Sequence, residues 1–117
     1  MTTDFELQTL DRGAAITVIR VRGRMDAHNM PVLVRACQQV RTSGRSLVLN
    51  LSGVSFIASS GVGALLALVD EYRQHSADLQ LAEVSEAVGA VLKLLHLEPY
   101  LPIQRSEAAA CGEAEAA

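Results

Sequence analysis

The sequence has few aromatic residues and no excess of basic ones. Its 117 residues include two phenylalanines, two tyrosines and no tryptophan. Proteins that stack nucleic-acid bases on exposed rings depend on aromatic side chains, which are scarce here. The formal net charge of −3 also gives no sign of the basic patch that binds a phosphate backbone. The composition therefore argues against a nucleic-acid-binding protein.

Long apolar runs and a secretory start are also missing. The longest apolar stretch, Ala64 to Val69, is far shorter than the roughly 20 residues of a membrane-spanning helix. The first residues, MTTDFELQ, lack the basic start and apolar segment of a signal peptide. Cys37 and Cys111 show no metal-type spacing and nothing that suggests an oxidising compartment. We therefore expect a soluble cytoplasmic protein without membrane insertion.

What is present is enough apolar sequence for one compact domain, since half of the residues are hydrophobic. Alternating apolar residues predict strands, and apolar residues at helical spacing predict helices. We expect Asn29 and Ser85 to cap the first and third helices, and Cys37 to lie in the core. The predicted elements are strands at 5–8, 16–23, 47–51 and 79–84, helices at 30–40, 62–72 and 88–95, and an optional last strand at 101–104.

This order predicts an α/β fold with a mixed sheet of four to five strands. Gly13 and Ala14 allow the first two strands to form a hairpin, and the helices imply parallel, right-handed crossovers between later strands. Several strands alternate, so the helices should cover mainly one face of the sheet. We expect residues 1–105 to form the domain and the Ala/Glu-rich residues 106–117 to form a tail, either a flexible segment or a marginal helix.

The stretch FIASSGVGALLALV, residues 56–69, joins the third strand to the second helix and holds the best candidate site. A helix start presents unpaired N–H groups, and the glycines allow another surface to approach closely. A nucleotide P-loop is excluded because no lysine follows the glycines. The dinucleotide fingerprint fails because Leu66 stands in place of its third glycine. The two serines could also be simple helix caps.

Catalysis is not indicated at this turn. The G-x-S-x-G elbow of serine hydrolases is absent, because Ile57 and Ala58 stand where glycine would precede Ser59 or Ser60 by two residues. His28 could approach the turn, but no acid is evident to orient it. We therefore predict no enzyme activity, no catalytic residue, no metal site and no cofactor, and we expect the three histidines on the surface.

A loop G-R-M-D-A-H-N, then a strand LVLNLS, then VSFIASSGVGALL and a helix together resemble the STAS family, whose bacterial members include anti-sigma factor antagonists. The resemblance covers about residues 4 to 105 in the same element order. It implies a protein that binds a serine-kinase anti-sigma factor, is phosphorylated by it on the serine turn, and is reset by a metal-dependent serine phosphatase. We assign the phosphoacceptor to Ser60, with Ser59 as the alternative.

The resemblance also implies a partner interface around the turn, and a homodimer is conceivable. Phosphorylation would add about −1.5 to −2 charges there and so release the partner. Two positions differ from the family pattern: Ala58 replaces the usual aspartate, and Arg24 replaces a frequent glutamate. Arg24 is either a solvated charge or a ligand for a phosphate on Ser60. The predicted interface consists of Asp26, His28, Asn29, Ala58, Ser59, Ser60, Gly61, Val62 and Leu65.

Two alternatives remain open. Because Ala58 leaves dependence on a kinase unsettled, the chain could be a constitutive STAS assembly subunit, such as a partner of an ABC lipid transporter or a signalling scaffold, without phosphorylation. A groove near Asp26 could instead bind a nucleotide or another small ligand, as the resemblance allows.

Overall fold

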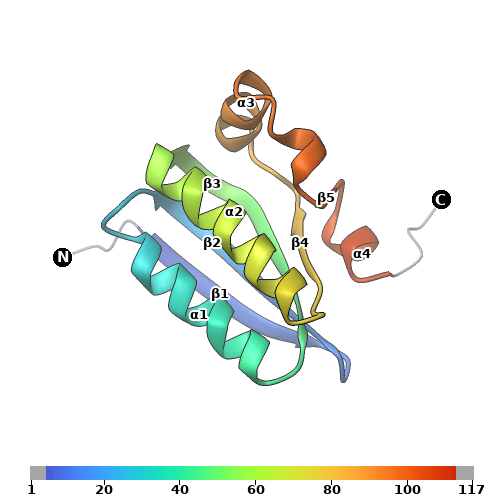
Figure 1. Ribbon diagram of the computed structural model, residues 1–117. Coiled ribbons are helices and arrows are strands. Elements are labelled where there is room, and N and C mark those ends of the chain that lie inside the picture. The colour runs from blue at the N-terminus through green and yellow to red at the C-terminus, as the bar shows by residue number, and fades with distance from the viewer. Residues whose placement is uncertain (1–4, 113–117) are drawn as a thin grey trace.

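The computed structural model describes residues 5–112, which form one five-stranded mixed sheet with helices on both faces. Figure 1 shows the elements in chain order. The strands are β1 (Phe5–Arg12), β2 (Ile16–Met25), β3 (Ser46–Ile57), β4 (Leu79–Ala82) and β5 (Ile103–Gln104). The helices are α1 (Met30–Thr42), α2 (Ser59–Gln74), α3 (Glu86–Leu94) and α4 (Glu107–Ala110), with a 3-10 turn η1 (Glu98–Tyr100).

The sheet has the strand order β1-β2-β3-β4-β5. Strands β1 and β2 form the predicted antiparallel hairpin, and every later neighbour pairs in parallel. The predicted α/β class, hairpin and mixed sheet are therefore confirmed, and the optional last strand is present as β5. Because β2, β3 and β4 are parallel, their carboxyl ends meet at one edge of the sheet.

Helices α1, α2 and α3 cover one sheet face and enclose the main core. That core joins alternate residues of β2 and β3, such as Ile19 and Leu49, to the apolar faces of the helices. Cys37 is fully buried there, as predicted, and its backbone carbonyl accepts a hydrogen bond of 2.6 Å from the hydroxyl of Tyr72. Burial raises the pKa of the Cys37 thiol to about 12, so this group stays protonated and unreactive near neutral pH.

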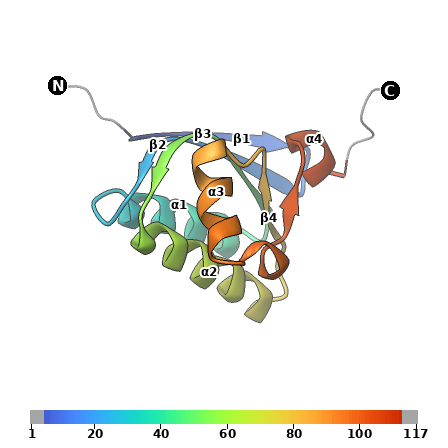
Figure 2. The same cartoon turned by 90° about the horizontal axis from the view of Figure 1, so that it is seen from above.

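The segment after residue 105 contains a short helix, which is one of the two alternatives predicted for the tail, and is not flexible there. Residues 106–112 are folded, and α4 lies on the sheet face opposite α1 and α2, as Figure 2 shows. Ala110 packs against Val18, Val48 and Ala82 in a second, smaller apolar cluster. The side chain of Glu107 accepts hydrogen bonds of 3.1 and 3.0 Å from Arg20. Residues 113–117 of the predicted tail lie outside the described residues.

Strand β3 runs farther than the predicted 47–51 and delivers the serine turn to the sheet edge. Its pairing with β2 has register shifts between Arg20 and Arg22 and between Gly23 and Arg24, where β3 carries extra residues. The bulges interrupt the alternation that the strand prediction uses, so the sequence pattern ends too early. No helix in the described part of the chain is long and apolar enough to span a membrane.

Candidate functional site

The serine turn and the loop after β2 lie side by side at the carboxyl edge of the sheet. Met25 ends β2 and Ile57 ends β3, and the two residues are register partners. The backbone N–H of Ala58 donates a 3.0 Å hydrogen bond to the carbonyl oxygen of Met25. Parallel pairing therefore brings together residues 26–29 and 58–60, which are about thirty positions apart in the sequence.

Gly61 fixes the start of α2 against the end of β2. A Cβ atom at this position would come within 2.5 Å of the Met25 carbonyl oxygen and 2.8 Å of Ile57 Cγ1. Contacts that short do not occur, so any side chain here would push the helix away from the sheet. The glycine is needed for a close approach inside the protein, and Gly61 itself is buried.

Part of the predicted partner interface is wrong. Val62 and Leu65 are 6% and 0% exposed. Both belong to the main core, together with Met25 and Ile57 at the ends of β2 and β3. With so little exposed surface, they offer almost nothing to a partner while the domain is folded. The sequence already carried this signal, because Val62 and Leu65 share the apolar helix face with Val69 and Tyr72. Gly61 is likewise a packing residue and not a contact residue.

Ser59 and Ser60 are exposed on the outer surface of the first turn of α2. Neither is a cap, because the N-cap residue is Ala58, with extended backbone (φ −92, ψ 170) and no side-chain hydrogen bond. The interpretation of the serines as simple caps is therefore wrong. Ser85 and Ser106 do cap α3 and α4, accepting hydrogen bonds from backbone N–H groups in the first turn.

The start of α2 also lacks compensation of its helix dipole. Its first turn contains no acidic residue, whereas α3 begins with Glu86 and α4 with Glu107. A helix N-terminus carries a partial positive charge and unpaired N–H groups. The two serine hydroxyls thus lie where a negative charge added to either of them would be favourable for the helix.

Asp26 organises the neighbouring loop. Its Oδ1 accepts a 3.1 Å hydrogen bond from the backbone N–H of Asn29. Asn29 is the N-cap residue of α1, as predicted, but its side chain makes no cap bond and its amide instead donates a 2.9 Å bond to the Arg24 carbonyl oxygen. Asp26 and Asn29 are half-buried, and His28 is exposed beside them, as predicted. Of this loop, the exposed residues are Ala27 and His28.

Arg24 and Phe56 form a contact that sequence reasoning missed. The guanidinium carbon of Arg24 lies 4.1 Å from the centre of the Phe56 ring, a cation–π geometry. Arg24 Nε is also 3.6 Å from Asp26 Oδ2. Arg24 is exposed, in agreement with a solvated charge, and it already has two neighbours of its own. An exposed aromatic residue two positions before the turn was the available signal.

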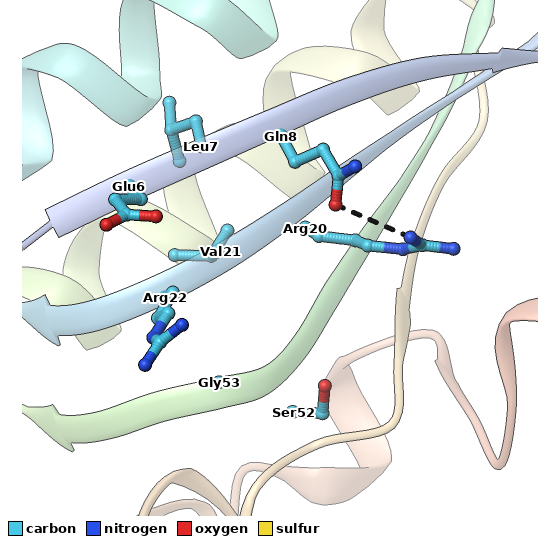
Figure 3. Close-up of a pocket in the computed structure, with 8 residues that line it drawn as sticks. All are labelled: Glu6, Leu7, Gln8, Arg20, Val21, Arg22, Ser52 and Gly53. Carbon is cyan, nitrogen blue, oxygen red and sulfur yellow. Dashed lines mark hydrogen bonds between the residues drawn. The ribbon is translucent and has the colours of Figure 1, made fainter.

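A separate groove of about 270 Å³ crosses β1, β2 and β3. Figure 3 shows its residues, with Arg20 reaching the side-chain oxygen of Gln8 at 3.4 Å. Asp26 is not among the lining residues, so this is not the groove that the sequence suggested near Asp26. The groove is lined by Glu6, Leu7, Gln8, Arg20, Val21, Arg22, Ser52 and Gly53.

Within residues 5–112, no group of three His, Cys, Asp or Glu side chains is arranged to hold a metal ion.

Comparison with known proteins identifies the family. The model of the STAS domain matches residues 7–110, and the chain belongs to this family. It is 24% identical over 86 residues to the anti-sigma-B factor antagonist of Staphylococcus aureus, covering 73% of this chain and 80% of the relative. The predicted family assignment is therefore confirmed.

Solved structures share the fold. An anti-sigma factor antagonist from Mycobacterium paratuberculosis superimposes with a TM-score of 0.81 at 22% identity, covering 92% of both chains. The Bacillus cell fate determinant SpoIIAA, in its phosphorylated form, gives a TM-score of 0.68 at 23% identity, covering 92% of this chain and 96% of that one. At these identities the likeness establishes the STAS fold.

Proposed function

We propose that this chain is an anti-sigma factor antagonist that binds a serine-kinase anti-sigma factor through the serine turn. The observation that carries the proposal is the pair of exposed hydroxyls, Ser59 and Ser60, on an uncapped and uncharged helix start. The neighbouring loop offers Ala27 and His28 to the same partner. The staphylococcal relative is named as an anti-sigma-B factor antagonist, and the match covers 80% of its length, which supports the same role.

Phosphorylation of the turn is the proposed release step, with Ser60 as the acceptor and Ser59 as the alternative. The γ-phosphoryl group of ATP would pass to the serine oxygen, leaving ADP and releasing the hydroxyl proton. The product would carry about −1.5 to −2 charges in the middle of a neutral contact surface. Desolvating that charge against a partner costs several kcal/mol, and about 1.4 kcal/mol is already a tenfold loss of affinity. A metal-dependent serine phosphatase would restore the unmodified chain.

The fold itself should tolerate the phosphate. The acceptor lies in the first turn of α2, where the helix dipole stabilises a negative charge by up to about 1 kcal/mol. The turn is also exposed, so the phosphate would remain hydrated in the free protein. Modification would therefore switch binding while the domain stays folded.

The first test compares substitutions at the two serines in binding to purified anti-sigma factors of the same organism, tested singly. Ser60→Asp should weaken binding at least about tenfold, whereas Ser60→Ala should bind like the unsubstituted chain. Ser59→Asp and Ser59→Ala form the matched pair. Equal affinity of all four variants would contradict control by phosphorylation at this turn.

A second candidate function is a constitutive STAS assembly subunit that is never phosphorylated. The observation that favours it is Ala58, which leaves the helix start without the acidic residue usual in the family. Incubation with the binding anti-sigma factor and ATP, followed by intact-mass measurement, separates the two functions. An increase of about 80 Da, mapped to Ser60 or Ser59, supports the antagonist. A chain that binds but keeps its mass supports the assembly subunit.

A further inference from the structure

Gly63 is a glycine in the second turn of α2 that no contact within the protein requires. The residue is exposed, and a Cβ atom built on it would have no neighbouring atom within 4 Å. Its backbone is helical, so it does not need the conformational freedom of glycine either. Glycine inside a helix is destabilising relative to alanine, because it loses more backbone freedom on folding. The fold therefore gives no reason for a glycine here.

Gly61 shows what an internal reason looks like. Its missing Cβ leaves room for the Met25 carbonyl oxygen, which would otherwise be 2.5 Å away. Gly63 lies two residues later, and on a helix this places it on the opposite, outward side. The space in front of Gly63 is open to solvent and is free for a group from outside the chain.

The surface around Gly63 is small and uncharged. Ser60 lies three residues before it and Ala67 four residues after it, so the three share one helix face, and all are exposed. The first charged residue of α2 is Asp70. Exposed helix faces usually carry charged side chains. Eleven uncharged residues at the start of α2, from Ser59 to Val69, suit a neutral partner surface instead.

We propose that Gly63 is the point of closest approach between α2 and the anti-sigma factor, occupied by a flat apolar side chain of that partner. This inference rests on the proposed function and names the chemistry of the same contact. Without a Cβ at Gly63, the apolar group lies directly on the helix backbone, one turn from Ser60. A phosphate on Ser60 would then be forced against an apolar group, which explains how one modification breaks the contact.

The test uses Gly63→Ala with Gly89→Ala as its matched control. Gly89 is a helix-interior glycine of α3, and a Cβ there meets Val84 Cγ1 at an ordinary 3.8 Å. Both substitutions should raise the melting temperature, by about 2–6 °C, because alanine favours the helix. Gly63→Ala alone should weaken binding to the anti-sigma factor about tenfold, the effect of forcing a methyl group into a packed contact. Gly63→Gln, a longer uncharged helix former, should weaken binding further.

The outcomes separate this inference from the proposed function. If the unsubstituted chain binds an anti-sigma factor and Gly63→Ala binds equally well, the inference is overturned while the function stands. A lower melting temperature for Gly63→Ala would also overturn it, because the glycine would then serve the fold. If the unsubstituted chain binds none of the anti-sigma factors of its organism, the proposed function fails and the Gly63 contact fails with it.

Discussion

At the scale of single residues, the start of α2 lacks stabilising features that the starts of α3 and α4 have. Ala58 is a poor N-cap, Gly63 is a poor helix former, and no acidic residue compensates the dipole. The two later helices, α3 and α4, have serine caps and acidic first turns. The start of α1 also has no side-chain cap bond and no acidic residue, but α2 adds an exposed interior glycine, and an exposed weak point of this kind is typical of a surface where function constrains the sequence.

Ala58→Asp should therefore stabilise the domain. The extended backbone of Ala58 (φ −92, ψ 170) is the conformation in which an aspartate side chain accepts a hydrogen bond from the first turn. We expect the free energy of unfolding to rise by about 0.5–2 kcal/mol, measured by urea denaturation at neutral pH. Ser85→Ala, which removes an existing cap, should lower it by a similar amount. An unchanged or lower stability of Ala58→Asp would show that the side chain cannot reach the helix start.

At the scale of elements, α1 and α2 are joined by one ion pair on their outer side. Arg41 Nε lies 2.8 Å from Glu71 Oε2, and this hydrogen bond holds the pKa of the Glu71 carboxyl below its ordinary value of 4.5. Gln38 Nε2 donates to the other carboxylate oxygen at 3.4 Å. The pair therefore fixes the helix that carries the serine turn to its neighbour on the sheet.

The Arg41–Glu71 pair should make the folded domain less stable as the pH falls. Because the pKa of Glu71 is lower in the folded state, its contribution is present above pH 4.5 and is lost as the pH falls through the folded-state pKa. Glu71→Gln should be less stable than the unsubstituted chain at pH 7, by at most about 1 kcal/mol since the pair is partly exposed. The difference should be smaller at about pH 2.5, because lowering the pH favours the protonated carboxyl, which cannot form the ion pair.

Asp70→Asn is a suitable control for that measurement. Asp70 is exposed on the same helix and its carboxylate accepts a hydrogen bond from Gln74 within α2, so it does not join two elements. Urea denaturation at both pH values would compare the three chains. A stability difference for Glu71→Gln that grows on acidification would contradict the role of the Arg41 pair.

At the scale of the whole molecule, α4 attaches the C-terminal part of the described chain to the second strand. Arg20 and Glu107 are 87 residues apart in sequence and make a bidentate pair. Glu83 Oε2 accepts a 3.1 Å hydrogen bond from the Glu107 backbone N–H, which connects the same point to the end of β4. The apolar contact of α4 is small, with Ala110 as its buried apolar side chain, so these polar contacts should decide whether α4 stays bound.

Glu107→Gln should loosen α4 without unfolding the domain. Hydrogen exchange followed by mass spectrometry should show several-fold faster exchange over residues 106–112, while α2 keeps its protection. Glu86→Gln, an exposed first-turn glutamate of α3, is the control and should leave α4 unchanged. If α4 exchanges at the same rate in all three chains, the apolar contact alone holds it.

The order of elements could be predicted from the sequence because alternation and helical spacing are strong where one face is buried. Leu47, Leu49 and Leu51 alternate and lie in the core as expected. The predicted third strand ended at residue 51, too early, because bulges beyond that point break the alternation of apolar residues. The prediction could not decide between a marginal helix and a flexible tail at α4, because four residues rich in alanine have no apolar spacing and their partners lie on distant strands.

The candidate site was predictable to a similar extent. The motif placed Ser59 and Ser60 on the surface and beside the Asp26 loop, and the structure brings these residues together. Val62 and Leu65 were assigned to the interface because they follow the motif, although their spacing predicted core. The difference between Gly61 and Gly63 could not be seen in the sequence, because it depends on a carbonyl oxygen of another strand.

The contact of Gly61 with the end of β2 has a consequence for how any signal leaves this protein. The start of α2 packs so closely against the end of β2 that no methyl group would fit between them at Gly61. We therefore expect that a phosphate on the neighbouring Ser60 would leave the backbone of the turn in place. A protein that distinguishes the phosphorylated from the unmodified chain must therefore contact the turn itself, because we expect no conformational change elsewhere in the chain.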